Sequence, residues 1–152
     1  MALDSFDIAI LRILQIDSST SQRQIGAAVH LSAPAVQRRI QRMGREGIIS
    51  ACVAQIQPEA VGLPLTIIVE VQLVSETIDE IDQMKSRFSS APEVQQCYYV
   101  TGDADFVLVL VVSSMTEYEN FTRQHFFHNG NVKKFRTIVS MDVVKRGVTL
   151  NI

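Results

Sequence analysis

Residues 21–49 have the sequence SQRQIGAAVHLSAPAVQRRIQRMGREGII and contain two helix starts that lie eleven residues apart. Ser21 is followed three residues later by Gln24, which is the spacing of a capping box, and Ser32 stands as an N-cap before an apolar-periodic run. Gly47 suits the position just after a helix end, where the backbone turns left-handed. The stretch therefore predicts two short helices joined by a tight turn.

The second of these helices separates apolar from basic side chains. Val36, Ile40 and Met43 repeat at intervals of four and three residues and form one apolar stripe. Arginines on a helix often mark no more than a solvated face, but here Glu46 is the one acidic residue nearby. The pattern is typical of the DNA-reading helix of a helix-turn-helix. Four arginines lie outside the stripe or on its flank: Arg38, Arg39, Arg42 and Arg45.

Charge is divided unequally along the chain. The first fifty residues carry six basic and four acidic side chains, a net charge of +2. The remaining residues carry eight basic and twelve acidic side chains, a net charge of −4, so the total net charge is −2. A chain with this balance would not bind DNA indiscriminately. We therefore expect a small basic patch, duplicated by dimerisation, to supply the phosphate contacts.

The 152 residues suffice for one ordinary domain or two small ones. No run of about 18 apolar residues and no signal-peptide core occurs, so we expect a soluble, cytoplasmic protein with no membrane partner.

Cys52 and Cys97 are isolated and are expected to be buried, reduced thiols. His125 and His128 have a spacing that can bind a metal, but a core histidine and a partner of the helix C-terminus are favoured. His30 is expected to be structural.

A first helix over Asp4–Gln15, with Asp4 as N-cap and Asp7 in its first turn, completes a three-helix unit. The β-rich segment Ile48–Ile56 predicts a winged extension. Pro58, Gly62 and Pro64 then break the pattern. These signals predict a winged helix-turn-helix DNA-binding domain at 1–57, a linker at 58–64 and a second domain at 65–152.

The second domain shows strand and helix periods in the order βαββαβ, an α+β fold of the ferredoxin-like type with helices on one face of an antiparallel sheet. The strand FVLVLVV contains no polar residue, so it should be buried on both faces, and a second subunit should cover the face that the helices leave open. The predicted elements are Leu65–Val74, Glu76–Ser89, Val94–Thr101, Phe106–Val112, Thr116–Asn129 and Phe135–Lys145.

The segment TGDAD, residues 101–105, allows two interpretations. One is a hairpin in which Gly102 supplies a positive φ and the aspartates cap the turn. The other is a site in which backbone N–H groups around Gly102 bind an α-carboxylate while Asp103 or Asp105 accepts an α-ammonium. No nucleophile and base pairing or phosphate loop accompanies it, so the sequence predicts neither an enzyme nor a cofactor.

Three groups of residues together resemble the Lrp/AsnC, or feast/famine, family of transcription regulators along nearly the whole chain. Leu3, Asp4, Asp7, Ile10 and Leu11 match its LDxxDxxIL signature. The second group matches the family's recognition-helix pattern and consists of Leu31-Ser32, Arg39-Ile40 and Gly47-Ile48-Ile49. The third group, Thr101 to Asp105, is similar to the family's TGxxD loop.

The resemblance implies a winged helix-turn-helix head and a ferredoxin-like sensing domain that forms homodimers, often octamers, and binds an amino acid where dimers meet. Two departures stand out. Gly44 lies inside the recognition helix, and Phe135 replaces one of two small hydroxyl residues, of which Thr137 is retained. Leucine-like specificity is therefore not carried over.

The sequence thus predicts a DNA-binding transcription regulator that responds to an amino acid or related metabolite. The rival hypothesis is a ferredoxin-like small-molecule-binding enzyme or carrier with an N-terminal protein-interaction head. The predicted DNA contacts, with Arg38 at a base edge and the other arginines mostly on phosphates, are Ser32, Ala35, Arg38, Arg39 and Arg42. The predicted effector residues are Thr101, Gly102, Asp103, Asp105 and Thr137, with no metal site.

Overall fold

The computed structural model describes residues 2–128 and 130–152. The chain forms two compact units, of which one comprises Met1–Gln55 with Lys145–Ile152 and the other Ile56–Val144. The first unit is called the head and the second the sheet domain. The last eight residues thus group with the head, whereas the sequence-based boundary assigns them to the second domain.

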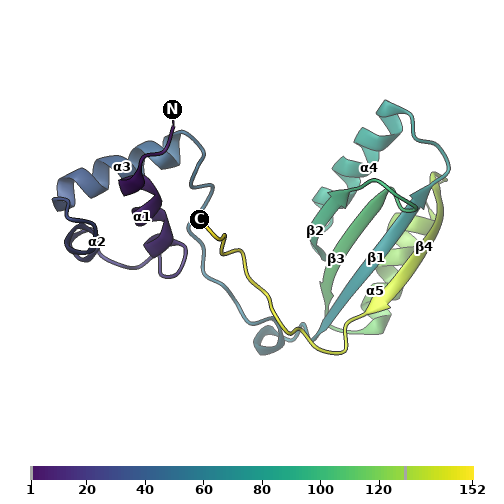
Figure 1. Ribbon diagram of the computed structural model, residues 1–152. Helices are drawn as coiled ribbons and strands as arrows, with labels where there is room; N and C mark the ends of the chain where they lie inside the picture. The colour runs from purple at the N-terminus through teal and green to yellow at the C-terminus, as the bar shows by residue number, and fades with distance from the viewer. Residues whose placement is uncertain (1, 129) are drawn as a thin grey trace. The chain divides into compact units, whose positions relative to one another are not determined.

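The head contains three helices, α1 (Ser5–Leu14), α2 (Gln22–Val29) and α3 (Ala33–Arg45) (Figure 1). Each begins at the predicted cap: the side chains of Asp4, Ser21 and Ser32 accept hydrogen bonds from backbone N–H groups three residues on. Apolar residues from all three helices form the core of the head: Ile10, Ile25, Val29, Val36 and Met43.

The turn between α2 and α3 depends on two unusual positions. His30 ends α2 in the left-handed conformation, with φ 58° and ψ 40°, which confirms its structural role. A Cβ on Gly26 would lie 2.4 Å from the carbonyl oxygen of Leu31. Only glycine therefore allows the chain to cross α2 this closely.

The predicted wing is wrong as secondary structure, because residues 48–56 form no strand. Helix α3 ends at Arg45, and Gly47 has the predicted left-handed backbone just after the helix end, with φ 73°. The Ile48 N–H donates to the Met43 carbonyl at 2.9 Å. A strand needs a neighbour for its backbone groups, and none of the strands in the described part of the chain pairs with this segment.

One side chain of α1 and one from the residue that caps its C-terminus hold the end of the described chain against the head. The Gln15 amide donates to the Leu150 carbonyl at 2.9 Å and accepts from the Leu150 N–H at 3.0 Å. The Arg12 Nε donates to the Ile152 carbonyl at 2.5 Å. These contacts explain why Lys145–Ile152 groups with the head.

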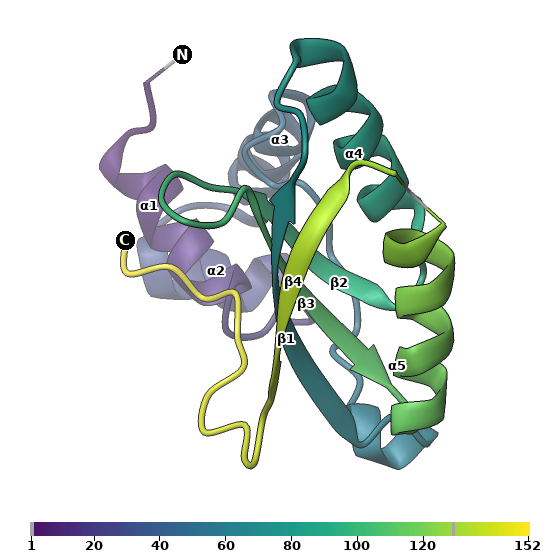
Figure 2. The same cartoon turned by 90° about the vertical axis from the view of Figure 1, so that its right-hand side faces the viewer.

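The sheet domain has the predicted βαββαβ order, and its four strands form an antiparallel sheet in the order β2-β3-β1-β4. Helices α4 and α5 cover one face of this sheet (Figures 1 and 2). A short 3₁₀ helix, η1 (Pro58–Val61), precedes it. The other elements are β1 (Leu65–Leu73), α4 (Ile78–Ser90), β2 (Val94–Tyr99), β3 (Phe106–Val112), α5 (Met115–Thr122), the π-helical turn η2 (Arg123–Phe127) and β4 (Val132–Val139).

Strand β4 begins three residues earlier and ends six residues earlier than the predicted span 135–145. The predicted helix 116–129 begins at Met115 and changes into a π-helical turn at Arg123. Its predicted last residue, Asn129, lies outside the described residues. None of the helices in the described ranges is long and apolar enough to cross a membrane.

Strand β3 alternates between two environments instead of being buried on both faces. Phe106, Leu108, Leu110 and Val112 are buried beneath the helices. On the face without helices, Val107, Val109 and Val111 are half-buried in the single chain. The thiol prediction also needs correction, because Cys52 is exposed and Cys97 half-buried.

Candidate nucleic-acid interface and effector site

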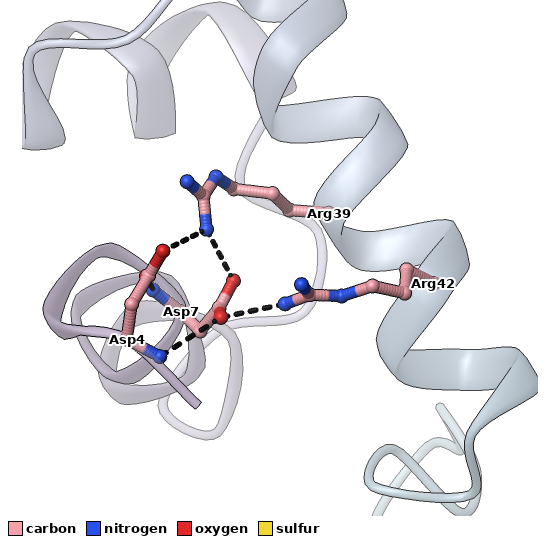
Figure 3. A network of polar contacts seen from close by, with 4 residues as sticks. All are labelled: Asp4, Asp7, Arg39 and Arg42. Carbon is pink, nitrogen blue, oxygen red and sulfur yellow. Dashed lines mark hydrogen bonds and ion pairs between the residues drawn. The ribbon is translucent and has the colours of Figure 1, made fainter. Parts of the chain in front are cut away.

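A buried carboxylate on α1 holds two of the arginines of α3 (Figure 3). Asp7 accepts from Arg39 at 2.7 Å on Oδ1 and from Arg42 at 2.5 Å on Oδ2. Asp4 accepts from the same Nη1 of Arg39 at 2.8 Å. The Phe6 ring lies 5.5 Å from the Arg39 guanidinium carbon. Arg39 and Arg42 are therefore engaged within the head, although the sequence assigned both to DNA.

The two aspartates also support each other through the capping box of α1. The Asp7 N–H donates to Asp4 at 2.8 Å, and the Asp4 N–H donates to Asp7 at 3.1 Å. Burial by itself raises the pKa of Asp7, but the Asp4 N–H, Arg39 and Arg42 outweigh it and lower the pKa from 3.8 to about 2. Asp7 is therefore charged at neutral pH although its side chain is only 1% exposed.

The exposed side of α3 carries five side chains beside the exposed Gly44, and we call these five residues the outer stripe. It includes two glutamines that are not among the predicted DNA contacts, although they share the helical spacing of Arg38 and Arg45. Glutamine side chains can bond adenine through two hydrogen bonds, and arginine can do the same with guanine. The members of the outer stripe are Pro34, Gln37, Arg38, Gln41 and Arg45.

The other two predicted DNA residues lie at the start of α3. Ser32 is exposed, and its hydroxyl accepts from the Ala35 N–H at 3.3 Å, so the side chain caps the helix. Ala35 is half-buried. Of the five residues predicted to contact DNA, three thus lie on or beside the accessible side of α3 and two are bound to α1.

The TGDAD loop is a hairpin between β2 and β3 with a positive φ at Gly102, as the first interpretation has it, but the Asp105 side chain bonds β1 instead of capping the turn. Gly102 has φ 118°, which strains any other residue. The Asp105 side chain accepts from the Leu73 N–H at 2.7 Å, and the Asp105 N–H donates to the Val71 carbonyl at 2.9 Å. Asp105 therefore anchors the loop to the end of β1. The side chains of Thr101 and Asp103 are exposed.

Thr137 does not join this loop through its hydroxyl. It stands opposite Val69 in the sheet, and its hydroxyl is hydrogen-bonded to the Tyr118 hydroxyl of α5 on the face that the helices cover. Burial raises the pKa of Tyr118, and the bond to Thr137 opposes that rise. Phe135 is half-buried beside the aromatic ring of Phe126, with the ring centres 4.6 Å apart. Phe135 therefore serves the core.

The two histidines of the last helix have separate roles, as expected. His125 is buried and stacked on Phe121 with ring centres 4.5 Å apart, and burial lowers its pKa. His128 ends the π-helical turn, and its ring contacts the Arg123 carbonyl. Across the described ranges, no group of three or more His, Cys, Asp or Glu side chains is placed to hold a metal.

A hollow of 630 Å³ lies between α4 and the segment before β4 and contains none of the predicted effector residues. Glu80, Arg87 and Ser90 border it on one side, and His128 and Asn131 on the other. Its polar side chains lie mostly on the surface of α4. No pattern in the sequence marks this hollow, because its residues come from segments about forty positions apart.

Comparison with known proteins agrees with both halves of this architecture. Residues 3–43 match the family model of the AsnC-type helix-turn-helix domain, and residues 66–150 match that of the Lrp/AsnC ligand binding domain. The chain is 43% identical over 145 residues to an uncharacterised HTH-type transcriptional regulator of Sinorhizobium fredii, covering 95% of this chain and 86% of that protein.

Two further relatives extend the comparison. The leucine-responsive regulatory protein of Haemophilus influenzae is 32% identical, with 95% of this chain and 87% of that protein covered. The crystal structure of an AsnC family transcriptional regulator from Agrobacterium tumefaciens superposes with a TM-score of 0.91 at 30% identity, covering 97% of this chain and 96% of that one. With its helix-turn-helix head and its βαββαβ sheet domain, the chain belongs to the Lrp/AsnC family of transcription regulators.

Proposed function

We propose that this regulator binds specific DNA sequences through the outer stripe of α3 and changes its activity when the sheet domain binds an amino acid or a related metabolite. One observation carries the first part: α3 buries Val36 and Met43 in the head and exposes two arginines and two glutamines on its other side. These side chains are suited to base edges and phosphates.

Within the outer stripe, Arg38 is the residue we assign to a base edge, with Gln37 and Gln41 beside it and Arg45 on phosphate. Ser32 and Ala35 lie at the groove near the start of the helix. The bonds of Arg39 and Arg42 to Asp7 favour a role for both in holding α3 in place.

The DNA assignment can be tested by gel-shift titration against the promoter region of the protein's own gene. Arg38→Ala should weaken specific binding by about 1–3 kcal/mol and relax sequence preference. Arg123→Ala is the matched control, because Arg123 is an exposed arginine of the sheet domain that pairs with Glu119. Unchanged affinity and preference in Arg38→Ala would disprove the assignment.

We further propose that the open face of the sheet packs against a second copy of the chain. The helices leave this face uncovered, and it carries Ile68, Val107, Val109, Val111 and Ile138. A monomer rarely exposes so large an apolar patch. Such a dimer presents two recognition helices to a pseudo-palindromic site, and dimers can assemble into octamers.

Light scattering tests this assembly. The wild-type chain should be at least dimeric at micromolar concentration, and Val109→Asp should shift it towards monomer. Asp82→Asn, an exposed change on α4, is the control. A stable wild-type monomer would refute the proposal.

The effector is proposed to bind beside Thr101, Gly102 and Asp103 at a contact between dimers. The loop is exposed, and its glycine allows close approach of a ligand's carboxylate to backbone N–H groups. Asp105 supports the loop from β1, and Thr137 contributes through Tyr118. The name of the Haemophilus relative, leucine-responsive regulatory protein, favours an amino acid as the class of ligand.

A thermal-shift screen of the twenty amino acids tests the effector site. An effector must bind one assembly better than another, and a tenfold preference corresponds to about 1.4 kcal/mol. Gly102→Val should abolish the response to any amino acid that raises the Tm of the wild-type protein. A response that survives this change, or the absence of any response, would exclude the proposed pocket.

The rival hypothesis of an enzyme or carrier makes a different forecast. Membership of a family of transcription regulators favours DNA binding over catalysis. If the rival were correct, the protein would show no salt-sensitive shift with any duplex.

A further inference from the structure

We infer that Asp7 is a positioning residue that limits non-specific DNA binding, because it holds Arg39 and Arg42 away from phosphates. This inference rests on the proposed DNA-binding function and concerns a residue on α1, outside the outer stripe. Figure 3 shows the arrangement: the two arginines extend from successive turns of α3 and converge on one carboxylate.

Asp7 restrains these arginines more firmly than a surface ion pair would. Its side chain is 1% exposed, whereas the side chains of Arg39 and Arg42 are 25% and 26% exposed. An arginine that moved to a phosphate would leave a buried carboxylate without its partner, which is strongly unfavourable. An exposed acid imposes no such penalty, since water can solvate it.

Arg39 is held from a second side as well. Asp4 binds the same guanidinium nitrogen at 2.8 Å, and the Phe6 ring lies beneath the guanidinium. Of the four arginines on α3, Arg39 and Arg42 are thus paired with Asp7, and Arg39 also with Asp4. Arg38 and Arg45 remain exposed on the outer stripe.

This division of the arginines affects the two kinds of DNA binding differently. Non-specific affinity depends mainly on how many phosphates are neutralised, and each contact steepens the dependence on salt by about 0.9 in log–log slope. Specific affinity also depends on base contacts, which require a fixed helix orientation. Holding two arginines on Asp7 therefore lowers non-specific binding and keeps α3 oriented for base contacts.

The test measures the binding of the full chain to a 30-base-pair duplex of random sequence over a range of salt concentrations. Asp7→Asn preserves shape but removes the charge that holds both arginines. We expect binding about tenfold tighter at low salt and a slope steeper by up to about 1.8 per head. Asp17→Asn is the matched control, because Asp17 is an exposed acid of the same head whose carboxylate accepts from the backbone N–H and the hydroxyl of Ser19.

Three outcomes separate the possibilities. If both variants change equally, the effect is one of net charge and the inference fails. If Asp7→Asn leaves the slope of a salt-sensitive wild type unchanged, the inference fails while the proposed function stands. If the wild-type chain binds no duplex at any salt concentration, the proposed function itself fails.

A second variant covers the case in which Asp7→Asn loses its helical circular dichroism. Asp4 is about half exposed and binds one of the two arginines, Arg39. Asp4→Asn should therefore fold and give a smaller change of the salt slope in the same direction. Adding Arg39→Gln and Arg42→Gln to Asp7→Asn should return the slope to the wild-type value or below. A slope that stays steep in the triple variant would overturn the inference.

Discussion

Among the residues that the structure describes, five buried apolar residues and one buried carboxylate hold the three short helices of the head together, whereas fifteen buried apolar residues form one cluster in the sheet domain. That larger core includes edge-to-face aromatic contacts, such as Phe88 with Phe106 at 5.4 Å between ring centres. A small core leaves the head dependent on a few polar and backbone contacts. The sheet domain, by contrast, depends on packing, so the two regions should respond to different substitutions and to pH differently.

The largest effect is expected in the core of the sheet domain. Phe88→Ala should lower its free energy of unfolding by about 3–5 kcal/mol, because a fully buried ring leaves a cavity. The measurement is denaturant unfolding followed by tyrosine fluorescence, since Tyr98, Tyr99 and Tyr118 all lie in this domain.

Phe127→Ala is the control for this change, because Phe127 is 71% exposed and should cost much less. Equal losses in the two variants would show that burial does not decide stability in this domain.

The second effect is the acid sensitivity of the head. The pKa of Asp7 is about 2 in the folded chain and 3.8 as the ordinary value, so its contribution is present above pH 4 and is lost as the pH falls through 2. The contribution is about 2 kcal/mol. Amide hydrogen exchange in α1 to α3 should show the difference between wild type and Asp7→Asn shrinking from pH 5 to pH 2. A difference that is independent of pH would contradict this role for Asp7.

The third effect concerns the turn between α2 and α3. Gly26→Ala would bring a Cβ to 2.4 Å from the Leu31 backbone oxygen. The overpacking should lower the free energy of unfolding by about 1–3 kcal/mol, and the better helix propensity of alanine should raise it by up to about 1 kcal/mol. Faster exchange of the α2 and α3 amides should report the net loss. Unchanged protection would mean that the turn relaxes freely.

The smallest effect, and one of opposite sign, is expected at the other glycine inside a helix of the head. Gly44 is exposed, and a Cβ there would meet nothing within 4 Å. Gly44→Ala should therefore stabilise α3 by up to about 1 kcal/mol. Slower amide exchange near the end of α3 would support this, and a destabilised helix would show that glycine is needed there for another reason.

Local signals in the sequence predicted most of the fold. The caps Asp4, Ser21 and Ser32 and the stop at Gly47 mark helix ends through bonds that span three to five residues, so sequence spacing suffices to identify them. Alternation in β1 likewise identifies its buried face. The predicted wing shows the limit of such signals: residues 48–56 have β-forming side chains, but a strand also needs a partner.

The candidate sites were less predictable, because their contacts join distant segments. Gly102 and its hairpin follow from local turn chemistry, whereas the bond from Thr137 to Tyr118 depends on how α5 packs on the sheet. Helical geometry places Arg38 and Arg45 outside the apolar stripe of α3, but it places Arg42 there as well and so does not separate the exposed arginines from one that is bound to Asp7.

The sequence by itself determined where the three helices of the head begin, the order of strands and helices in the sheet domain, and the presence of four arginines on one helix, because each depends on neighbours along the chain. Only the tertiary structure decided which arginines are accessible to DNA. Asp7 lies 32 residues from Arg39 and 35 from Arg42. A buried carboxylate must be paired, and packing of α1 against α3 selects the partners.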